Sequence, residues 1–553
     1  MSKNLSALSF RKGLDANVFD RLVETAEAHG TAEIDAELHQ MGEESLFGDA
    51  VTLGAVSFYD FLKKEHAGKK VLLCNGSACL CAGTHGDLHA EAAKAFAAEE
   101  IGHICCLGRC HQGSAFQYEG RNYSNQTHAQ LANLFAKGEG DASDQYAVVS
   151  MLPEPILTAP FSGIEAYYAP LREWFARSRE EMAVELRESK LRGRGGAGFP
   201  VHLKWQSCRE ATGVVKYIVC NADEGDPGAY IDKYLMEEQP HSVLFGMLVA
   251  GWFCGAQVGV LYIRAEYPDS ITRMNEAVLA LREAGWLGKN IQGSGFDFDF
   301  KTIKGAGAYI CGEETALLAS IEGQRPEVRV RPPFPTVEGL FRRPTVVNNV
   351  ETFANLRPIL TMGGAAYAKI GTEHSTGPKL LSLDSSFRKP GIYEVAMGTP
   401  LEDVFYGPAG GFWRPIKAVQ VGGPLGGIVP VDKLGSLTVD FESFRKEGFL
   451  LGHAGVVSIP TSMPMIEYIE HLFQFTADES CGKCFPCRLG STRGQELIAK
   501  ARKGEGRIDR ELINDLLETM EQTSLCALGG GVPLPIKNAL RYFADELQQY
   551  FQS

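Results

Sequence analysis

The chain has 553 residues, of which 44% are hydrophobic and 22% charged, and its formal charge is -14. This length exceeds one hydrophobic core, so several domains are expected, and the ordinary composition excludes a disordered or fibrous chain. The acidic balance argues against a nucleic-acid partner, because phosphate binding needs clustered Lys and Arg that this sequence lacks. The first twenty residues contain no apolar core of signal-peptide length, which predicts a cytoplasmic protein.

Two segments are predicted ahead of the first long α/β region. Residues 1–65 carry apolar side chains at helical spacing and are expected to form a helical N-terminus. Residues 66–145 follow the order strand, helix, strand and hairpin, which is consistent with a thioredoxin-like domain.

Two cysteine pairs lie on separate loops of this second segment, Cys74 with Cys79 and Cys106 with Cys110. Disulfides are not expected, since the cytoplasm keeps thiols reduced, and the clustering suggests a metal site. Four thiolates suit a [2Fe–2S] cluster, because the spacing within each pair leaves room for an inorganic core. A zinc site and a redox-active thiol pair are the alternatives.

Residues 146–365 alternate buried strands with helices and predict a parallel α/β sheet. Residues 366–462 hold short strands separated by Gly and Pro and predict a small β-rich domain. One apolar stretch, Val243–Ile263, has the length of a membrane span. Its glycines divide it into a helical and a β-branched half, so a buried helix followed by a strand is the preferred interpretation.

Glycine-rich and acidic loops follow the predicted strands of the α/β region. The stretch "LRGRGGAGFPVHLKW" combines glycines with Arg192, Arg194 and Lys204, which lets backbone N–H groups and positive charge approach a phosphate. The loop "CNADEGDPGAY" adds side chains able to hydrogen-bond a polyol or a heterocycle edge. A second glycine loop, "GAGAYICGEETALL", places Glu313 and Glu314 at a helix start, where complementing the helix dipole is their alternative role. Together the loops favour a nucleotide site.

The last segment, residues 463–553, is rich in helix formers and contains "ESCGKCFPCRLG". Two residues separate Cys481 from Cys484 and Cys484 from Cys487, and Cys526 is the only later cysteine. Three closely spaced cysteines with one distant cysteine form the ligand pattern of a [4Fe–4S] cluster, which is preferred here over zinc.

Six motifs in order, "RGRGGAGFP", "CNADEGDPG", "GAGAYICGEETALL", "RPPFP", "PTVVNNVET" and "ESCGKCFPCR", carry a resemblance over residues 180–545. The chain resembles the NADH-oxidising flavoprotein subunit of respiratory complex I and its relatives in NAD-reducing [NiFe] hydrogenases and NAD-dependent formate dehydrogenases. The first 140 residues look like the small [2Fe–2S] subunit of complex I, fused to it. The resemblance implies a multidomain α/β chain: a Rossmann-like FMN- and NAD-binding domain over 146–365, a ubiquitin-like β-grasp domain over 366–462, and a C-terminal helical bundle with the [4Fe–4S] cluster.

The resemblance also implies roles for the matching residues. The FMN phosphate and ribityl chain would lie against the glycine loop and its cations, Gly193, Arg194, Gly195, Gly196 and Lys204, with Asn348 and Asn349 on the phosphate side. The isoalloxazine ring would lie against Asn221, Asp223 and Glu224. Phe199 and Phe334 would stack on the adenine of NAD, and Glu314 would bind a ribose hydroxyl. Arg331 stands where the family commonly has Lys, and the resemblance marks the remaining cofactor-binding positions as Tyr309, Gly312 and Glu313. Glu224 and Asp226 are the predicted catalytic residues, with Asp226 beside the nicotinamide.

These roles predict a diaphorase subunit, which exchanges a hydride between NAD(H) and FMN and single electrons between FMN and the clusters. Its expected partners are NAD(H) and the iron–sulfur and catalytic subunits of a hydrogenase, formate dehydrogenase or complex I-like assembly. The alternatives are an electron-transfer scaffold that keeps the clusters without nucleotide chemistry, and a zinc-stabilised binding module.

Overall fold

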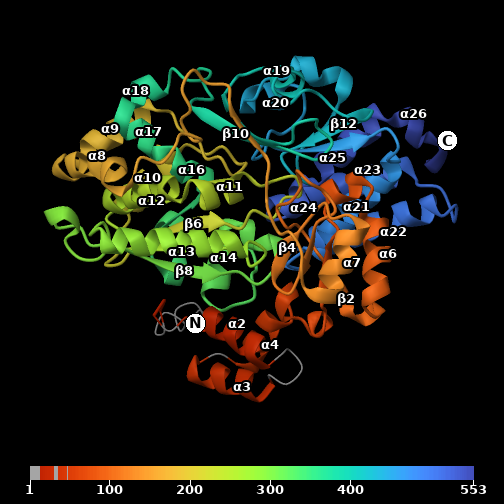
Figure 1. Ribbon diagram of the computed structural model, residues 1–553, viewed down its shortest axis with the longest axis horizontal. Coiled ribbons are helices and arrows are strands. Elements are labelled where there is room, and N and C mark those ends of the chain that lie inside the picture. Colours follow the sequence, from red (N-terminus) through yellow and green to blue (C-terminus); the bar gives the residue numbers. More distant parts are fainter. Residues whose placement is uncertain (1–12, 16, 30–34, 47, 553) are drawn as a thin grey trace.

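A computed structural model describes residues 13–15, 17–29, 35–46 and 48–552. Three β-sheets and their surrounding helices make up a multidomain α/β fold with parallel strands, as predicted (Figure 1). The predicted helical N-terminus falls partly outside the described residues. No helix within the described ranges is long and apolar enough to cross a membrane.

The first sheet has the strand order β2-β1-β3-β4. Strand β1 (Val71–Cys74) runs parallel to β2 (Ile101–Ile104) and antiparallel to β3 (Phe116–Tyr118), which pairs with β4 (Arg121–Tyr123). Helices α5 (Ser77–Ala82) and α6 (His85–Ala95) connect β1 to β2, and α7 (His128–Lys137) follows β4. The two cysteine pairs therefore lie where β1 and β2 end, because Cys74 closes β1 and Cys106 follows β2.

The second sheet is wholly parallel, in the order β8-β7-β6-β9. Its strands are β6 (Tyr217–Ala222), β7 (Val258–Ile263), β8 (Asp299–Lys304) and β9 (Thr345–Asn349). Helix α12 (Pro240–Cys254) leads directly into β7. The interpretation of Val243–Ile263 as a buried helix followed by a strand is therefore confirmed.

Each face of this sheet is covered. Alternate residues of β6, such as Ile218 and Cys220, share a core with α12, whereas Tyr217 and Val219 face the opposite core. That second core includes Phe19 of α2 (Val18–His29) and residues of α14 (Glu314–Ile321). Burial on both faces explains the unbroken apolar strands and leaves the strand ends as the place where polar side chains gather.

The third sheet is mixed and has the order β13-β12-β14-β10-β11-β5. Its strands are β5 (Ala147–Ser150), β10 (Pro378–Leu383), β11 (Gly391–Ala396), β12 (Ile416–Val421), β13 (Ile428–Pro430) and β14 (Gly455–Pro460). Strand β5 pairs in parallel with β11, so the chain enters this sheet before it forms the parallel one. The predicted domain boundaries remain predictions, although this pairing associates residues 147–150 with the β-rich region.

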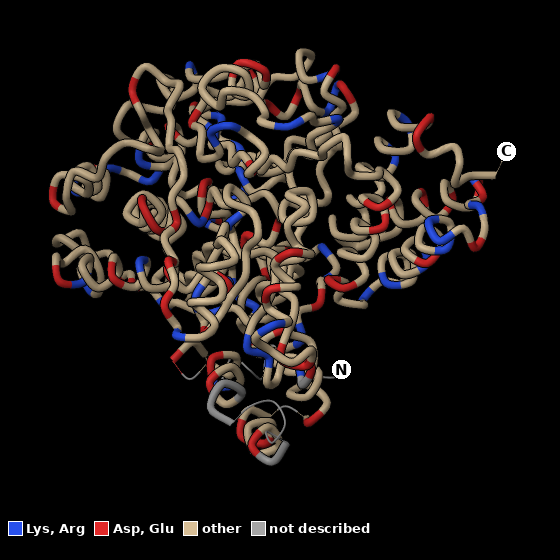
Figure 2. Tube along the Cα trace, turned by 45° about the vertical axis from the view of Figure 1, so that its right-hand side comes forward, with Lys and Arg blue, Asp and Glu red and all other residues tan. Residues whose placement is uncertain are grey.

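Helices α21 (Met465–Asp478), α22 (Phe485–Arg502), α23 (Arg510–Thr523), α24 (Ala527–Gly531) and α25 (Pro533–Tyr542) form most of the C-terminal region. They lie beside the first sheet and its helices (Figure 1). The Ser77 hydroxyl lies 3.0 Å from His471 Nε2 on α21, which joins the first cysteine loop to this region. Acidic and basic residues are interspersed along the described chain in Figure 2.

Candidate functional site

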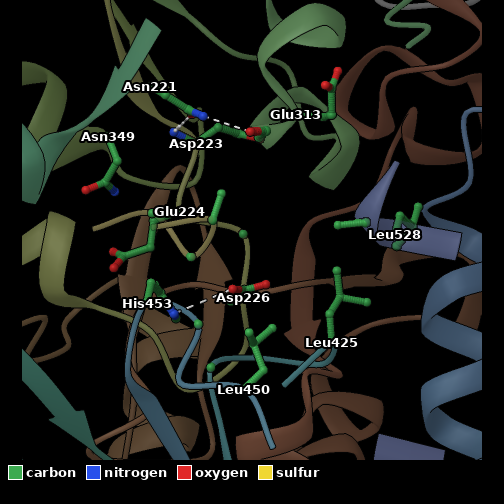
Figure 3. Close-up of a pocket in the computed structure, with 18 of the residues that line it drawn as sticks. Asn221, Asp223, Glu224, Asp226, Glu313, Asn349, Leu425, Leu450, His453 and Leu528 are labelled. Carbon is green, nitrogen blue, oxygen red and sulfur yellow. Dashed lines mark hydrogen bonds and ion pairs between the residues drawn. The ribbon is translucent and has the colours of Figure 1, made fainter. Parts of the chain in front are cut away.

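A cavity of about 440 Å³ opens where the parallel strands end. The register pairs Asn221 at the end of β6 with Asn349 at the end of β9, and both line the cavity. The opposite walls come from the β-rich region and from the start of α24. Figure 3 shows side chains from these three regions facing one space. The cavity volume lies within the range of small-molecule and cofactor sites.

Of the predicted cofactor-binding and catalytic residues, ten lie together here and eight lie outside. Those that line the cavity are Gly195, Gly196, Asn221, Asp223, Glu224, Asp226, Tyr309, Gly312, Glu313 and Asn349. Those that do not line it are Gly193, Arg194, Phe199, Lys204, Glu314, Arg331, Phe334 and Asn348.

The glycine loop presents bare backbone to the cavity. A Cβ at Gly195 would lie 3.0 Å from the Asn349 Cβ, and Gly196 adopts φ +114°, a conformation that side chains disfavour. Polar backbone groups therefore stay accessible at this wall. This arrangement fits a phosphorylated flavin, whose phosphate needs close approach to N–H groups.

Glu224 is buried at the start of α11 (Ile231–Glu238). Its carboxylate accepts hydrogen bonds from the backbone N–H groups of Asp232 at 2.9 Å and Lys233 at 3.1 Å. Burial raises the pKa of Glu224 to about 7, because it disfavours the charged form more than these donors favour it. A carboxyl group that titrates near neutral pH suits proton exchange.

Asp226 lies between two groups on the cavity wall. The Tyr309 hydroxyl donates a hydrogen bond to Asp226 Oδ1 at 2.6 Å, and His453 Nδ1 lies 3.6 Å from Oδ2. Burial raises the pKa of Asp226 to about 6, against the opposing effect of the Tyr309 hydrogen bond. Nearby Asp223 is also buried, which raises its pKa well above the usual range. Figure 3 shows these carboxyl groups around the same space.

Two predicted phosphate-binding cations are held elsewhere. The Arg194 guanidinium is fully buried and donates to the carbonyl oxygens of Thr376 at 2.6 Å and Pro378 at 3.2 Å. Lys204 Nζ lies 2.9 Å from Glu314 Oε2 and donates to the Val347 carbonyl at 2.8 Å. Arg194 thus anchors the glycine loop to the β-rich region, and its side chain does not reach the cavity.

Glu313 performs the helix-start role that the sequence left as an alternative, and it also lines the cavity. Its carboxylate caps α14 by accepting the N–H groups of Thr315 at 2.8 Å and Ala316 at 2.9 Å. Glu314 instead pairs with Lys204 and, at 2.8 Å, with Arg331. This ion-paired cluster lies outside the cavity lining.

Three further predicted residues also lie outside the lining. Phe199 and Phe334 are 53% and 55% exposed, so both rings remain available to stack on a planar ligand. Asn348 accepts a hydrogen bond from Trp205 Nε1 at 2.9 Å within the core.

The four C-terminal cysteines share one cluster. Cys481 and Cys487 are buried in it, and Cys484 and Cys526 pack against it. Burial raises the pKa of Cys487 to about 11 and that of Cys526 to about 12, so these thiols need a bound cation to ionise. Cys526 also lines the cavity, together with Ala527 and Leu528. The donor set fits an iron–sulfur cluster directly behind the cavity.

The four N-terminal cysteines are likewise buried together. The sulfurs of Cys106 and Cys110 lie 3.3 Å apart, and Cys74 lies within hydrogen-bonding range of both Cys79 and Cys106. Cys81 is placed differently: its carbonyl accepts a hydrogen bond from Arg414 at 2.8 Å, and burial raises the pKa of its thiol. The first four therefore lie close enough to form one donor set, and their binding of a [2Fe–2S] cluster stays a prediction.

The cysteine sulfurs do not converge on one point. Among the described residues, no group of three or more His, Cys, Asp or Glu side chains could hold a single metal ion. Thiolates around a multi-iron core bind different irons, so they need not converge.

Sequence reasoning missed one whole wall of the cavity. The residues that the β-rich region contributes are Gly422, Leu425, Phe441, Arg445, Phe449, Leu450, Leu451, Gly452 and His453. Two glycine-rich stretches, "VGGPLGG" and "LGHAG", are the local signals in the sequence of this wall. The contact depends on tertiary packing between segments far apart in the chain, which no local pattern records.

The parallel sheet, the cavity at its strand ends and the flanking cysteine clusters define a flavin- and iron–sulfur-dependent oxidoreductase subunit. Two family models match the chain: the Nuo51 FMN-binding domain over residues 186–357 and the NADH-ubiquinone oxidoreductase-F iron-sulfur binding region over residues 467–550.

Curated relatives extend this match. The NADH-quinone oxidoreductase F subunit 2 of Rhizobium meliloti (strain 1021) is 42% identical over 389 residues, 70% of this chain and 92% of the relative. NADP-reducing hydrogenase subunit HndC of Solidesulfovibrio fructosivorans is 42% identical over 386 residues, 69% of this chain and 78% of the relative. A crystal structure of NAD+-reducing [NiFe]-hydrogenase in the H2-reduced state superposes with a TM-score of 0.85 at 28% identity, covering 97% of this chain and 93% of that one. The chain belongs to the family of NADH-quinone oxidoreductase F subunits.

Proposed function

We propose that this chain carries electrons between NAD(H) and a partner redox subunit, through FMN and two iron–sulfur clusters. Family membership makes it a flavin-dependent NAD(H) oxidoreductase subunit with an FMN-binding domain and a [4Fe–4S] region. The finer parts of the proposal are the N-terminal [2Fe–2S] cluster and the assembly, which is a hydrogenase, formate dehydrogenase or complex I-like complex. The NAD+-reducing hydrogenase structure, which covers nearly the whole chain, supports both.

One observation carries this proposal: a single cavity reaches from the glycine loop to a candidate cluster ligand. Gly195 and Gly196 lie on one wall and Cys526 on another. Bound FMN would supply the conversion between the two-electron chemistry of a nicotinamide and the one-electron chemistry of the clusters. Contact with Cys526 gives electrons a direct exit from that cavity.

The protein's own residues would bind, orient and exchange protons. The buried carboxyl groups of Glu224 and Asp226, with pKa values near 7 and 6, would take up or release a proton near physiological pH. Tyr309 would fix the Asp226 orientation through its 2.6 Å hydrogen bond. The exposed rings of Phe199 and Phe334 would stack on the adenine of NAD.

The surface beside Cys484 suits a redox partner. Phe485 and Leu489 are one turn apart on α22 and are 75% and 57% exposed. Exposed apolar side chains next to a cluster ligand support contact with an electron-exchanging protein at this face.

The test is Cys481→Ser in the full-length protein. FMN content and NADH oxidation by an artificial acceptor that draws electrons from the flavin should stay near wild type, because the entry site is intact. Reduction of the co-purifying partner should be lost with the exit cluster. Wild-type rates with the partner would refute the exit role of the cluster, and a wild-type chain without FMN would favour the scaffold alternative.

A further inference from the structure

The charges that line the cavity are unbalanced. Five lining residues are acidic, Asp223, Glu224, Asp226, Asp232 and Glu313, whereas Arg445 is the only Lys or Arg among the described residues that line it. A flavin phosphate carries negative charge, and each of these groups that is ionised repels it across a poorly solvated space. A cation near the glycine loop would therefore favour binding of the phosphate.

The cations nearest to that loop in sequence are already engaged. Arg192 pairs with Glu442 at 2.6 Å, the Arg194 guanidinium donates to buried carbonyl groups, and Lys204 pairs with Glu314. Arg445 is exposed, and within the described part of the chain its side chain has no hydrogen bond or ion pair. It is therefore the cation that is free to meet a ligand.

Arg445 also lies close to the glycine loop. It belongs to α20 (Phe441–Lys446), and the Arg192 guanidinium lies 4.2 Å from the centre of the Phe441 ring in that helix. A Cβ at Gly198 would lie 3.3 Å from the Phe441 ring. The helix thus packs on the loop, and Arg445, one turn along from Phe441, lines the same cavity as Gly195 and Gly196.

His453 is a second unexplained group of the same wall. It lines the cavity, is only 8% exposed, and neither ring nitrogen has a hydrogen-bond partner among the described residues. Its carbonyl accepts Lys379 Nζ at 2.8 Å, which fixes the main chain while the ring faces Asp226. Burial lowers the pKa of His453 to about 3, so the neutral ring offers one donor and one acceptor. The Asp226 carboxylate lies 3.6 Å from Nδ1, too far for a good hydrogen bond. A buried polar group without a hydrogen-bond partner is costly, so a ligand that supplies the partner binds more tightly.

We propose that the β-rich region is part of the flavin site, with Arg445 binding the FMN phosphate and His453 hydrogen-bonding the flavin ring. This inference rests on the proposed function and adds two binding residues to it. FMN and riboflavin differ only in the phosphate, so the two residues should respond differently to that pair of ligands.

The experiment titrates the full-length, flavin-free chain with FMN and with riboflavin and follows the quenching of flavin fluorescence. Arg445→Gln should weaken FMN binding by roughly ten- to a hundredfold and leave riboflavin binding unchanged, because a charge-assisted bond is lost. Arg445→Lys should recover part of the loss. Lys446→Gln, one residue along and outside the lining, is the matched control and should change neither affinity.

His453→Leu should weaken FMN and riboflavin equally, by roughly tenfold, since both carry the ring. His453→Asn, which keeps a donor and an acceptor, should recover part of it. His241→Leu is the matched control, because His241 is packed on Phe161 at 4.3 Å between ring centres, outside the cavity lining. Thermal unfolding checks that each variant folds.

Unchanged FMN affinity in folded Arg445→Gln or His453→Leu would overturn the corresponding assignment. A rise in the KM for NADH with unchanged FMN affinity would indicate that the residue belongs to the NAD site, and it would also overturn the assignment to the flavin. A wild-type chain that binds neither FMN nor riboflavin would refute the proposed function itself. This outcome is distinct from that of a variant that binds FMN as tightly as a wild type that does bind it, which refutes only the residue assignment.

Discussion

The backbone N–H of Gly228 donates a hydrogen bond to the sulfur of Cys110 at 3.2 Å. Gly228 stands two residues after Asp226 in the same short loop. The Asp226 carboxylate of this loop faces the cavity, and the Gly228 N–H group faces Cys110, a candidate cluster ligand. Arg264 strengthens the same junction by donating to the carbonyl oxygens of Glu224 and, at 3.0 Å, of Cys105. The N-terminal cysteines are therefore packed onto the loop that carries Asp226, and a substitution in this loop should affect both the cavity and the cysteine site.

Gly228→Ala tests this coupling. Gly228 has φ +98°, and a Cβ there would lie 2.6 Å from Val457 Cγ2. Backbone strain and a steric clash would therefore both destabilise the folded variant. We expect a loss of roughly 2–4 kcal/mol in stability, with FMN and iron content falling together. Gly83→Ala is the control, because Gly83 has φ +76° with open space around its Cβ position. The Gly83→Ala variant should lose about 1 kcal/mol of stability and keep its FMN and iron content. Loss of FMN without loss of iron would contradict the coupling.

The two cysteines on α5 give a sharper test of the [2Fe–2S] assignment. The Cys79 thiol lies within hydrogen-bonding range of Cys74, whereas Cys81 lies beside Arg414, whose side chain donates to the Cys81 carbonyl at 2.8 Å. Cys79→Ser should abolish the reduced [2Fe–2S] signal in electron paramagnetic resonance, and Cys81→Ser should leave it. The full-length chain is the right sample, because Gly228 and His471 cover the cysteine loops. Zinc without iron in the N-terminal site would refute the assignment.

Local sequence patterns predicted those features that depend on residues close together in the chain. The cysteine spacings and the acidic loop after β6 lie within short windows, and the structure assembles each into one site. The helix-then-strand interpretation of Val243–Ile263 was confirmed for the same reason, since a change of periodicity is visible in sequence.

What could not be predicted depends on distant partners. The Arg194 side chain donates to the carbonyl of Thr376, 182 residues away, and this contact turns a predicted phosphate ligand into an anchor. His453 approaches Asp226 from the β-rich region, and β5 joins a strand of that region. Charge and composition identify these residues as polar or apolar, but only packing decides which way they face.

The raised pKa of Asp226 predicts a pH dependence of stability. The folded carboxyl group has a pKa of about 6 against 3.8 for the ordinary group, so the folded state binds more protons between these values. Stability should therefore fall as pH rises from about 4 through 6, and the loss persists above pH 6. The shift corresponds to roughly 1–3 kcal/mol. Urea unfolding of flavin-free wild type and Asp226→Asn at pH 5 and pH 7.5 should show a smaller fall in the variant, and equal falls would contradict the assignment.

Glu314 offers the most direct test of the NAD site, because its two candidate roles predict different results. Burial alone would raise its pKa, but Lys204 and Arg331 outweigh burial and lower it. Glu314 is therefore ionised at neutral pH, and the stability from its ion pairs is lost only as pH falls through that lowered pKa. An ionised and partly exposed carboxylate is suited to bind a ribose hydroxyl.

Glu314→Gln keeps the size of the side chain and weakens a charge-assisted hydrogen bond. If Glu314 binds the NAD ribose, the KM for NADH should rise roughly ten- to a hundredfold, a cost of about 1–3 kcal/mol, with FMN content unchanged. If it serves only the helix and its cations, stability should fall by less than about 1 kcal/mol and the KM should stay constant. Kinetics with an acceptor that takes electrons from the flavin separates the two, since it bypasses both clusters. Glu338→Gln, which breaks an exposed 2.6 Å ion pair with Arg342, is the control for charge removal and should not alter the KM. A constant KM in Glu314→Gln would leave the NAD site resting on Phe199 and Phe334.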